Sequence, residues 1–155
     1  MTLQEFRKER KLTQKEASIL VGIPYRTYMR YEEDQKYEGS FKYQKILETL
    51  LEKTKIDEEN GLLSVKEIGE RVVPVLKEYN ISYCYLFGSY ARGEAKENSD
   101  VDLLIDTSIS GFEFMNIIES LRVALHKKVD LVRLDDLRND NPIIKEILKE
   151  GIRIL

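Results

Sequence analysis

Hydrophobic positions recur at helical spacing through the first third of the chain. The pattern predicts four helices, over residues 3–10, 13–21, 24–33 and 41–53. Thr13 and Glu16 have the spacing of a capping box, and Pro24 suits a first helical position because its missing N–H would be unpaired there anyway. Gly22 provides the turn between the second and third helices. The first third is therefore predicted to be an all-α bundle.

The rest of the chain mixes helical periods with short apolar runs. Residues 81–87 are apolar or aromatic almost throughout, as expected of a strand covered on both faces, and residues 100–105, 129–132 and 152–155 predict three further strands. Helices are predicted from Ser64 onward, over about 114–125, and from Pro142 to Gly151. Pro74 is expected to kink or break the first of these. The order of elements predicts a small α/β (α+β) domain.

The two patterns meet at an acidic stretch that contains glycine, KIDEENGLL. We therefore expect two domains, residues 1–55 and 64–155, joined by a linker over residues 56–63. No apolar run approaches the roughly 20 residues of a membrane helix, and no signal core precedes the first helix, so no membrane association and a cytoplasmic location are expected. One cysteine and one histidine exclude an internal disulfide and a Cys/His zinc site, so any metal must be held by oxygen ligands.

A candidate phosphate site follows the first apolar strand. The strand runs into Gly88 and Ser89, where a helix is expected to begin, so backbone N–H groups and the Ser89 hydroxyl would face outward at the positive end of a helix dipole. Arg92, one turn later, adds a cation that suits a triphosphate. Considered separately, the Gly-Ser pair is more often an ordinary turn.

A candidate metal site follows ten residues later. Asp100 and Asp102, at positions i and i+2 of a strand, place two carboxylates on one face, where they repel each other unless a cation neutralises them. Magnesium suits such oxygen ligands and is commonly held together with substrate phosphates. Asp130, on a strand expected to be adjacent, is the candidate third acid and general base of a two-metal site. The alternative is that all three are solvated charges.

In combination, these features resemble the signature of the polymerase-beta-like nucleotidyltransferase superfamily. GSYARGEAKENSDVDLLID, VDLV at 129–132 and the ending NPIIKEILKEGIRIL are similar to the minimal nucleotidyltransferase family over about residues 64–155. The resemblance implies a small mixed-sheet nucleotidyltransferase fold, with ATP as the substrate. It also implies that Gly88 and Ser89 bind nucleotide phosphates, that Asp100 and Asp102 bind Mg²⁺, and that Asp130 is the third catalytic acid.

The first third resembles the XRE-type, lambda-repressor-like helix-turn-helix. Residues 1–31 contain seven Lys/Arg and three Glu, and a third helix could offer base and phosphate contacts in a major groove. The acidic residues 32–34 oppose DNA binding there, which favours a dimer on a two-fold operator. The alternative is a bundle that serves only for docking or dimerisation. The candidate DNA-binding residues are Gln14, Tyr25, Arg26, Thr27 and Arg30.

The resemblance also implies a biological role. Minimal nucleotidyltransferases are typically paired with HEPN ribonuclease toxins, which implies an antitoxin that transfers AMP from ATP to a tyrosine of its toxin and binds operator DNA through its first domain. A homodimer or a hetero-oligomer with the toxin is expected. Two alternatives stay open: nucleotidyl transfer to a small molecule, and a repressor or sequestering antitoxin whose nucleotidyltransferase fold is an inactive scaffold.

Overall fold

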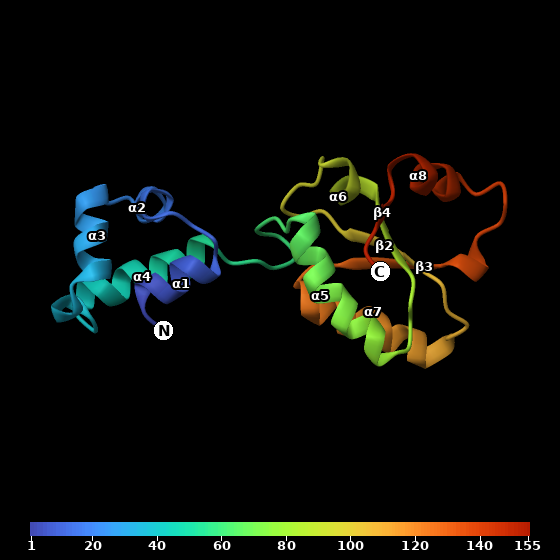
Figure 1. Cartoon of the computed structure of the whole chain (residues 1–155), viewed down its shortest axis with the longest axis horizontal. Helices are drawn as coiled ribbons and strands as arrows, with labels where there is room; N and C mark the ends of the chain where they lie inside the picture. The colour runs from blue at the N-terminus through green and yellow to red at the C-terminus, as the bar shows by residue number, and fades with distance from the viewer. The chain divides into compact units, whose positions relative to one another are not determined.

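The computed structural model describes residues 1–155, which form two compact units, Met1–Lys55 and Ile56–Leu155 (Figure 1). Each unit has its own cluster of buried hydrophobic residues, and the two clusters share no residue. None of the helices combines the length and the apolar character that a membrane span requires.

The first unit is entirely helical. Its buried cluster is built around Phe6, Tyr28 and Leu50, which come from three different helices. Thr2, Thr13 and Ser40 cap three of the helices by accepting a backbone N–H, so local sequence sets where those helices begin. All four predicted helices are present, each within one residue of its predicted ends. They are α1 (Leu3–Glu9), α2 (Gln14–Val21), α3 (Tyr25–Glu33) and α4 (Phe41–Lys53), with a 3₁₀ turn, η1 (Gln35–Tyr37), before α4.

A buried ion pair joins α1 to α3. The Glu32 side chain is fully buried, and its Oε1 lies 2.7 Å from Nη2 of Arg7. Gln14 Nε2 of α2 donates to the same Oε1 at 3.1 Å. Burial raises the pKa of Glu32, but the hydrogen bonds from Arg7 and Gln14 outweigh it, so the net pKa is lowered. Glu32 is therefore neutralised inside the unit, which corrects the expectation that residues 32–34 present a continuous acidic run.

The second unit is built on a four-stranded mixed sheet with the order β3-β2-β1-β4. β1 pairs antiparallel with β2 and with β4, whereas β2 and β3 are parallel. The mixed sheet agrees with the prediction. The strands are β1 (Cys84–Phe87), β2 (Val101–Ile105), β3 (Val129–Arg133) and β4 (Ile152–Arg153).

Helices lie on both faces of this sheet (Figure 1). Alternate residues of β2, namely Val101, Leu103 and Ile105, join the buried cluster formed with α5 and α7. The intervening side chain, Asp102, consequently projects toward the other face, on the side of α6 and α8. The helices are α5 (Val65–Glu78), α6 (Gly88–Arg92), α7 (Gly111–Leu125) and α8 (Pro142–Glu150), with a 3₁₀ turn, η2 (Leu134–Asp136), after β3.

Besides small shifts at the start of α7 and the end of β4, three details differ from the prediction. The first strand begins at Cys84 rather than at residue 81, because its partner β2 ends opposite it, at Ile105. α5 continues through Pro74. Proline has no backbone N–H, so the helix lacks one hydrogen bond there, but the exposed ring does not end it. Residues 56–63, predicted to be a linker, belong to the second unit, because Leu63 is buried in its core and Ile56 packs against it.

Candidate active site

The three candidate acids converge at one end of β2 and β3. Asp102 and Asp130 are direct partners in the parallel register, so their side chains project from the same face. Asp100 immediately precedes β2 and is exposed, as is Asp130, whereas Asp102 is half-buried. The predicted placement of Asp130 on the strand adjacent to Asp102 is confirmed.

Gly88 lies against the Asp102 carboxylate. Phe87 is the β1 partner of Asp102, and the chain leaves β1 at Gly88 with φ of 72°. A Cβ added at Gly88 would lie 2.1 Å from Oδ2 and 2.8 Å from Cγ of Asp102. Both the backbone conformation and the close approach therefore require glycine at this position. The structure thus brings Gly88, which follows β1, into contact with Asp102.

The electrostatics of the site are dominated by negative charge. Burial, as the largest cause, and the charges of Asp130, Asp100 and Glu146 together raise the pKa of Asp102 to about 6. Arg92 acts in the opposite direction. The carboxylates around Asp102 repel one another in the folded protein, and a bound cation would relieve this repulsion.

The donor set fits magnesium that arrives with a nucleotide. As they lie in the structure, no three His, Cys, Asp or Glu side chains form a ready-made metal cage. Mg²⁺ ordinarily takes only one or two carboxylates and completes its shell with water and substrate phosphates. Asp102, with Asp100 and Asp130 beside it, offers oxygen donors of this kind. The arrangement is consistent with an ion that needs the nucleotide to complete its site.

The candidate phosphate site is smaller than predicted. α6 begins at Gly88 as expected but is only five residues long. Its macrodipole is correspondingly weak, so any phosphate contact here must rest on individual N–H groups and on the half-buried Ser89. The backbone carbonyl of Ser89 accepts from Glu94 N at 2.9 Å, which closes the end of this short helix.

Arg92 binds carboxylates of its own chain. Its Nε donates to Glu94 at 2.9 Å, and its Nη1 donates to Glu146 of α8 at 2.5 Å. Glu150 lies 3.7 Å from the same Nη1. Sequence reasoning missed Glu146, which both holds Arg92 and raises the pKa of Asp102. Its contribution requires α8 to fold back over the sheet, which no local pattern indicates.

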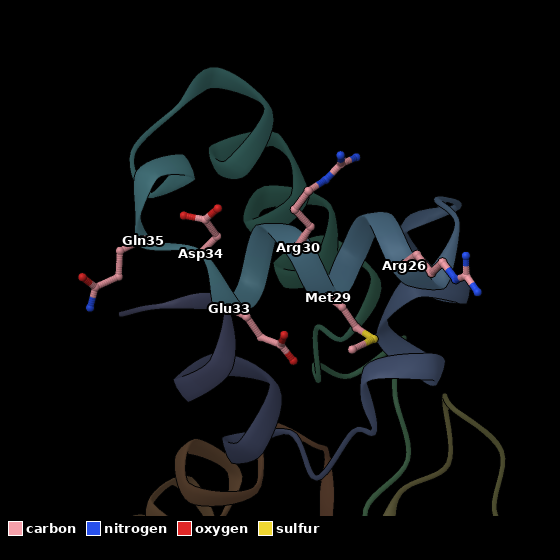
Figure 2. A pocket seen from close by; sticks show the side chains of 6 residues that line it. All are labelled: Arg26, Met29, Arg30, Glu33, Asp34 and Gln35. Carbon is pink, nitrogen blue, oxygen red and sulfur yellow. The ribbon is translucent and has the colours of Figure 1, made fainter.

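In the first unit, α3 carries two of the candidate DNA-binding cations. Arg26 and Arg30 are exposed and extend away from the helix, and Met29 and Glu33 project from the same stretch of α3 (Figure 2). These four side chains, with Asp34 and Gln35, line an open surface hollow of about 710 Å³.

The other candidate DNA-binding residues are less free. Tyr25 is 45% exposed, and its hydroxyl donates to Gln14 Oε1 at 3.4 Å. Gln14 in turn donates to Glu32 and Glu33 at 3.1 and 3.3 Å. Thr27 is half-buried beside α4. Arg26 and Arg30 are therefore the best presented members of the predicted set.

Comparison with known proteins gives a consistent result for the second unit. The protein adenylyltransferase MntA of Thermococcus cleftensis is 35% identical over 100 residues, which cover 61% of this chain and 99% of MntA. MJ1379 of Methanocaldococcus jannaschii, provisionally named a protein adenylyltransferase, is 34% identical over 96 residues, which cover 59% of this chain and 94% of that protein. Both relatives are thus matched over nearly their whole length by part of this chain.

Solved structures agree. A structure provisionally described as a minimal nucleotidyltransferase superposes with a TM-score of 0.50 at 26% identity, over 60% of this chain and 98% of that one. The crystal structure of a toxin-antitoxin with AMP-PNP shares the fold, with a TM-score of 0.50 at 23% identity, over 56% of this chain and 72% of that one. The family described as polymerase beta nucleotidyltransferase matches residues 70–155, which contain all three acids. The chain therefore belongs to the polymerase beta nucleotidyltransferase family and is a nucleotidyltransferase through its second unit.

Proposed function

We propose that this protein is an antitoxin that transfers AMP from ATP to a tyrosine of a partner HEPN ribonuclease toxin. The observation that carries the proposal is the close approach of Gly88 to Asp102. It places the start of the Gly88-Ser89 segment against an aspartate that has two further carboxylates beside it. The names of the relatives support protein as the acceptor class. The likeness to a toxin-antitoxin with AMP-PNP supports a toxin as the partner and ATP as the donor.

The reaction is a substitution at the α-phosphorus of ATP. The tyrosine oxygen forms a bond to the α-phosphorus, the bond from that phosphorus to the oxygen bridging to the β-phosphate breaks, and pyrophosphate leaves with the electron pair. Asp130, exposed beside Asp102, accepts the proton of the tyrosine hydroxyl as general base. Asp100 and Asp102 would hold magnesium, which supplies charge neutralisation for the phosphates.

The nucleotide phosphates are assigned to the segment after β1. Backbone N–H groups at Gly88 and Ser89, together with the Ser89 hydroxyl, donate to phosphate oxygens. Arg92 supplies a cation once a triphosphate competes with Glu146 for its guanidinium. The modified toxin gains bulk and negative charge at its tyrosine, which blocks RNA cleavage. The complex formed is a hetero-oligomer of toxin and antitoxin.

Intact-mass spectrometry of the partner toxin tests the activity. The toxin is incubated with this protein, ATP and Mg²⁺, and with two variants, Asp100→Ala/Asp102→Ala and the control Asp106→Ala. Asp106 is an exposed acid immediately after β2, outside the candidate site. We expect one or more AMP additions with the wild type and the control, and none with the double variant. Tight complex formation without any mass gain would instead favour an antitoxin that only sequesters its toxin.

A second role, operator binding by the first unit, is supported by the exposed Arg26 and Arg30 on α3. A gel-shift titration with the DNA upstream of the coding region compares Arg26→Ala/Arg30→Ala with Lys53→Ala/Lys66→Ala, which removes the same charge elsewhere. Loss of two phosphate contacts should weaken binding and reduce the salt dependence by about two ions. Equal binding by both variants would exclude α3 as the DNA-contacting surface.

A further inference from the structure

Lys127 is a fully buried lysine between α7 and β3, with 0% of the residue exposed. Its ammonium donates to two backbone carbonyls that are distant in sequence, that of Asn60 at 2.9 Å and that of Glu97. Neither partner is a carboxylate. The contacts are therefore not salt bridges, and they hold two segments of backbone in place. Nothing in the proposed chemistry uses this residue.

The Glu97 carbonyl belongs to the loop that leads to Asp100, a proposed metal ligand. Residues 93–100 connect α6 to β2, and Asp100 follows Glu97 by three positions. Lys127 itself precedes Asp130 by three positions, and the adjacent Lys128 carbonyl accepts from Val101 N at 2.9 Å. The Lys127 ammonium therefore connects the segment that leads to Asp100 with the segment that leads to Asp130.

The Asn60 carbonyl belongs to a turn that is held by hydrogen bonds of its own. Oδ1 of Asp57 accepts from the backbone N–H groups of Glu59 and Asn60 at 3.0 and 2.9 Å. The N–H of Asp57 donates to the same Asn60 carbonyl at 3.0 Å. The turn gives the ammonium a fixed point on one side, and the 93–100 loop lies on the other side.

Burying this charge is costly, which calls for a compensating role. Burial lowers the pKa of Lys127, although the carboxylates of Asp57, Glu97 and Glu59 oppose that shift. An apolar side chain of similar length would fill the same space without the desolvation cost. What it could not do is hold two carbonyls that otherwise have no connection to each other.

We propose that Lys127 is a positioning residue, which holds the 93–100 loop so that Asp100 stays in place beside Asp102 and Asp130 for metal and nucleotide binding. This inference rests on the proposed function, because it takes those three acids as the site. Residues that orient metal ligands in this indirect way typically contribute about 10- to 100-fold to metal affinity or activity.

The test compares Lys127→Met with Lys128→Met, in the full chain. Methionine keeps the length of the side chain but donates no hydrogen bond, and Lys128 is the exposed neighbour whose side chain has no assigned role. Binding of a non-hydrolysable ATP analogue is titrated with Mg²⁺ by calorimetry. Amide hydrogen exchange is followed by mass spectrometry in residues 93–100. We expect Lys127→Met to raise the half-saturating Mg²⁺ concentration about 10- to 100-fold and to speed exchange in the loop, whereas Lys128→Met changes neither.

A loss of thermal stability in Lys127→Met with unchanged Mg²⁺ half-saturation would overturn the proposal, because it would show a purely structural lysine. If Lys127→Met does not fold, the same two measurements are made on Lys127→Gln, whose side chain is one atom shorter and is expected not to reach both carbonyls, and unchanged Mg²⁺ dependence would again refute the role. The result is separable from the proposed function: if Asp100→Ala/Asp102→Ala leaves Mg²⁺-dependent analogue binding intact, the site assignment fails, whatever Lys127 does.

Discussion

Gly88→Ala is the substitution whose effect the structure defines most closely. Alanine at the observed φ of 72° incurs the left-handed penalty of about 1–2 kcal/mol. The new Cβ would also lie 2.1 Å from Oδ2 of Asp102, so the aspartate must leave its rotamer at a further cost of about 0.5–1.5 kcal/mol. Together these predict a destabilisation of about 1.5–3.5 kcal/mol. In a unit of this size, that lowers Tm by about 6 °C or more.

Gly93→Ala is the matched control. Gly93 has the same φ of 72°, but a Cβ there would meet nothing within 4 Å. Differential scanning calorimetry should therefore show the backbone penalty alone in Gly93→Ala, and a larger loss of stability in Gly88→Ala. The excess should be recovered in Gly88→Ala/Asp102→Ala, because truncating the aspartate removes the two shortest contacts.

Two results would refute this reasoning. Equal destabilisation by Gly88→Ala and Gly93→Ala would show that the aspartate yields without cost. Failure of Asp102→Ala to restore any stability to Gly88→Ala would show that the strain lies elsewhere. Under our interpretation, Gly88→Ala also loses Mg²⁺-dependent ATP binding, since the displaced carboxylate is a proposed metal ligand.

Three further outcomes follow from the charges in the structure. Asp102→Asn should stabilise the second unit by about 1 kcal/mol after allowance for solvent screening, and so raise its Tm, because it removes a half-buried charge and the repulsion of that charge from neighbouring acids. The same thermal scan should show no stabilisation by Mg²⁺ and ATP. Glu146→Gln should tighten ATP binding about fivefold in calorimetry, because it removes one negative charge from the site and one of the three carboxylates that hold Arg92. Glu32→Gln should destabilise the first unit by about 3 kcal/mol at neutral pH, because it leaves Arg7 without its buried partner.

The last of these effects depends on pH in a defined direction. The pKa of Glu32 in the folded protein is lowered from 4.5, so its stabilisation is complete above pH 4.5 and is lost as the pH falls through the lowered value. Acid unfolding of the first unit, followed by circular dichroism, should therefore lose one proton-linked step in Glu32→Gln. An unchanged acid transition would contradict the role assigned to the ion pair.

The features that sequence predicted well are local ones. The capping pair Thr13/Glu16 forms as expected, and Ser64/Glu67 and Asn141 cap α5 and α8, because each cap depends on residues within a single turn. Most helix and strand ends consequently fall close to their predicted positions. The adjacency of Asp102 and Asp130 was also predictable, since parallel strands joined by a helix commonly lie side by side.

The features that sequence missed are long-range ones. Lys127 contacts residues 67 and 30 positions away, and its sequence context, between a histidine and another lysine, is that of a solvated charge. Glu32 looks like part of an exposed acidic run until Arg7, 25 positions earlier, folds against it. Glu146 reaches Arg92 across 54 positions. In each case a charged residue is interpretable only after the packing is known, because local patterns carry no information about which charges become buried together.

The presence of two separate buried clusters has a practical consequence for thermal unfolding of the variants. Because no core residue is shared, each unit can lose its structure as its own cooperative transition, and a single melting temperature does not describe the chain. A substitution in Met1–Lys55 should leave the transition of Ile56–Leu155 where it was, and the reverse also holds. Each variant thus carries an internal reference: the unperturbed unit reports concentration, buffer and instrument drift in the same scan as the perturbed one.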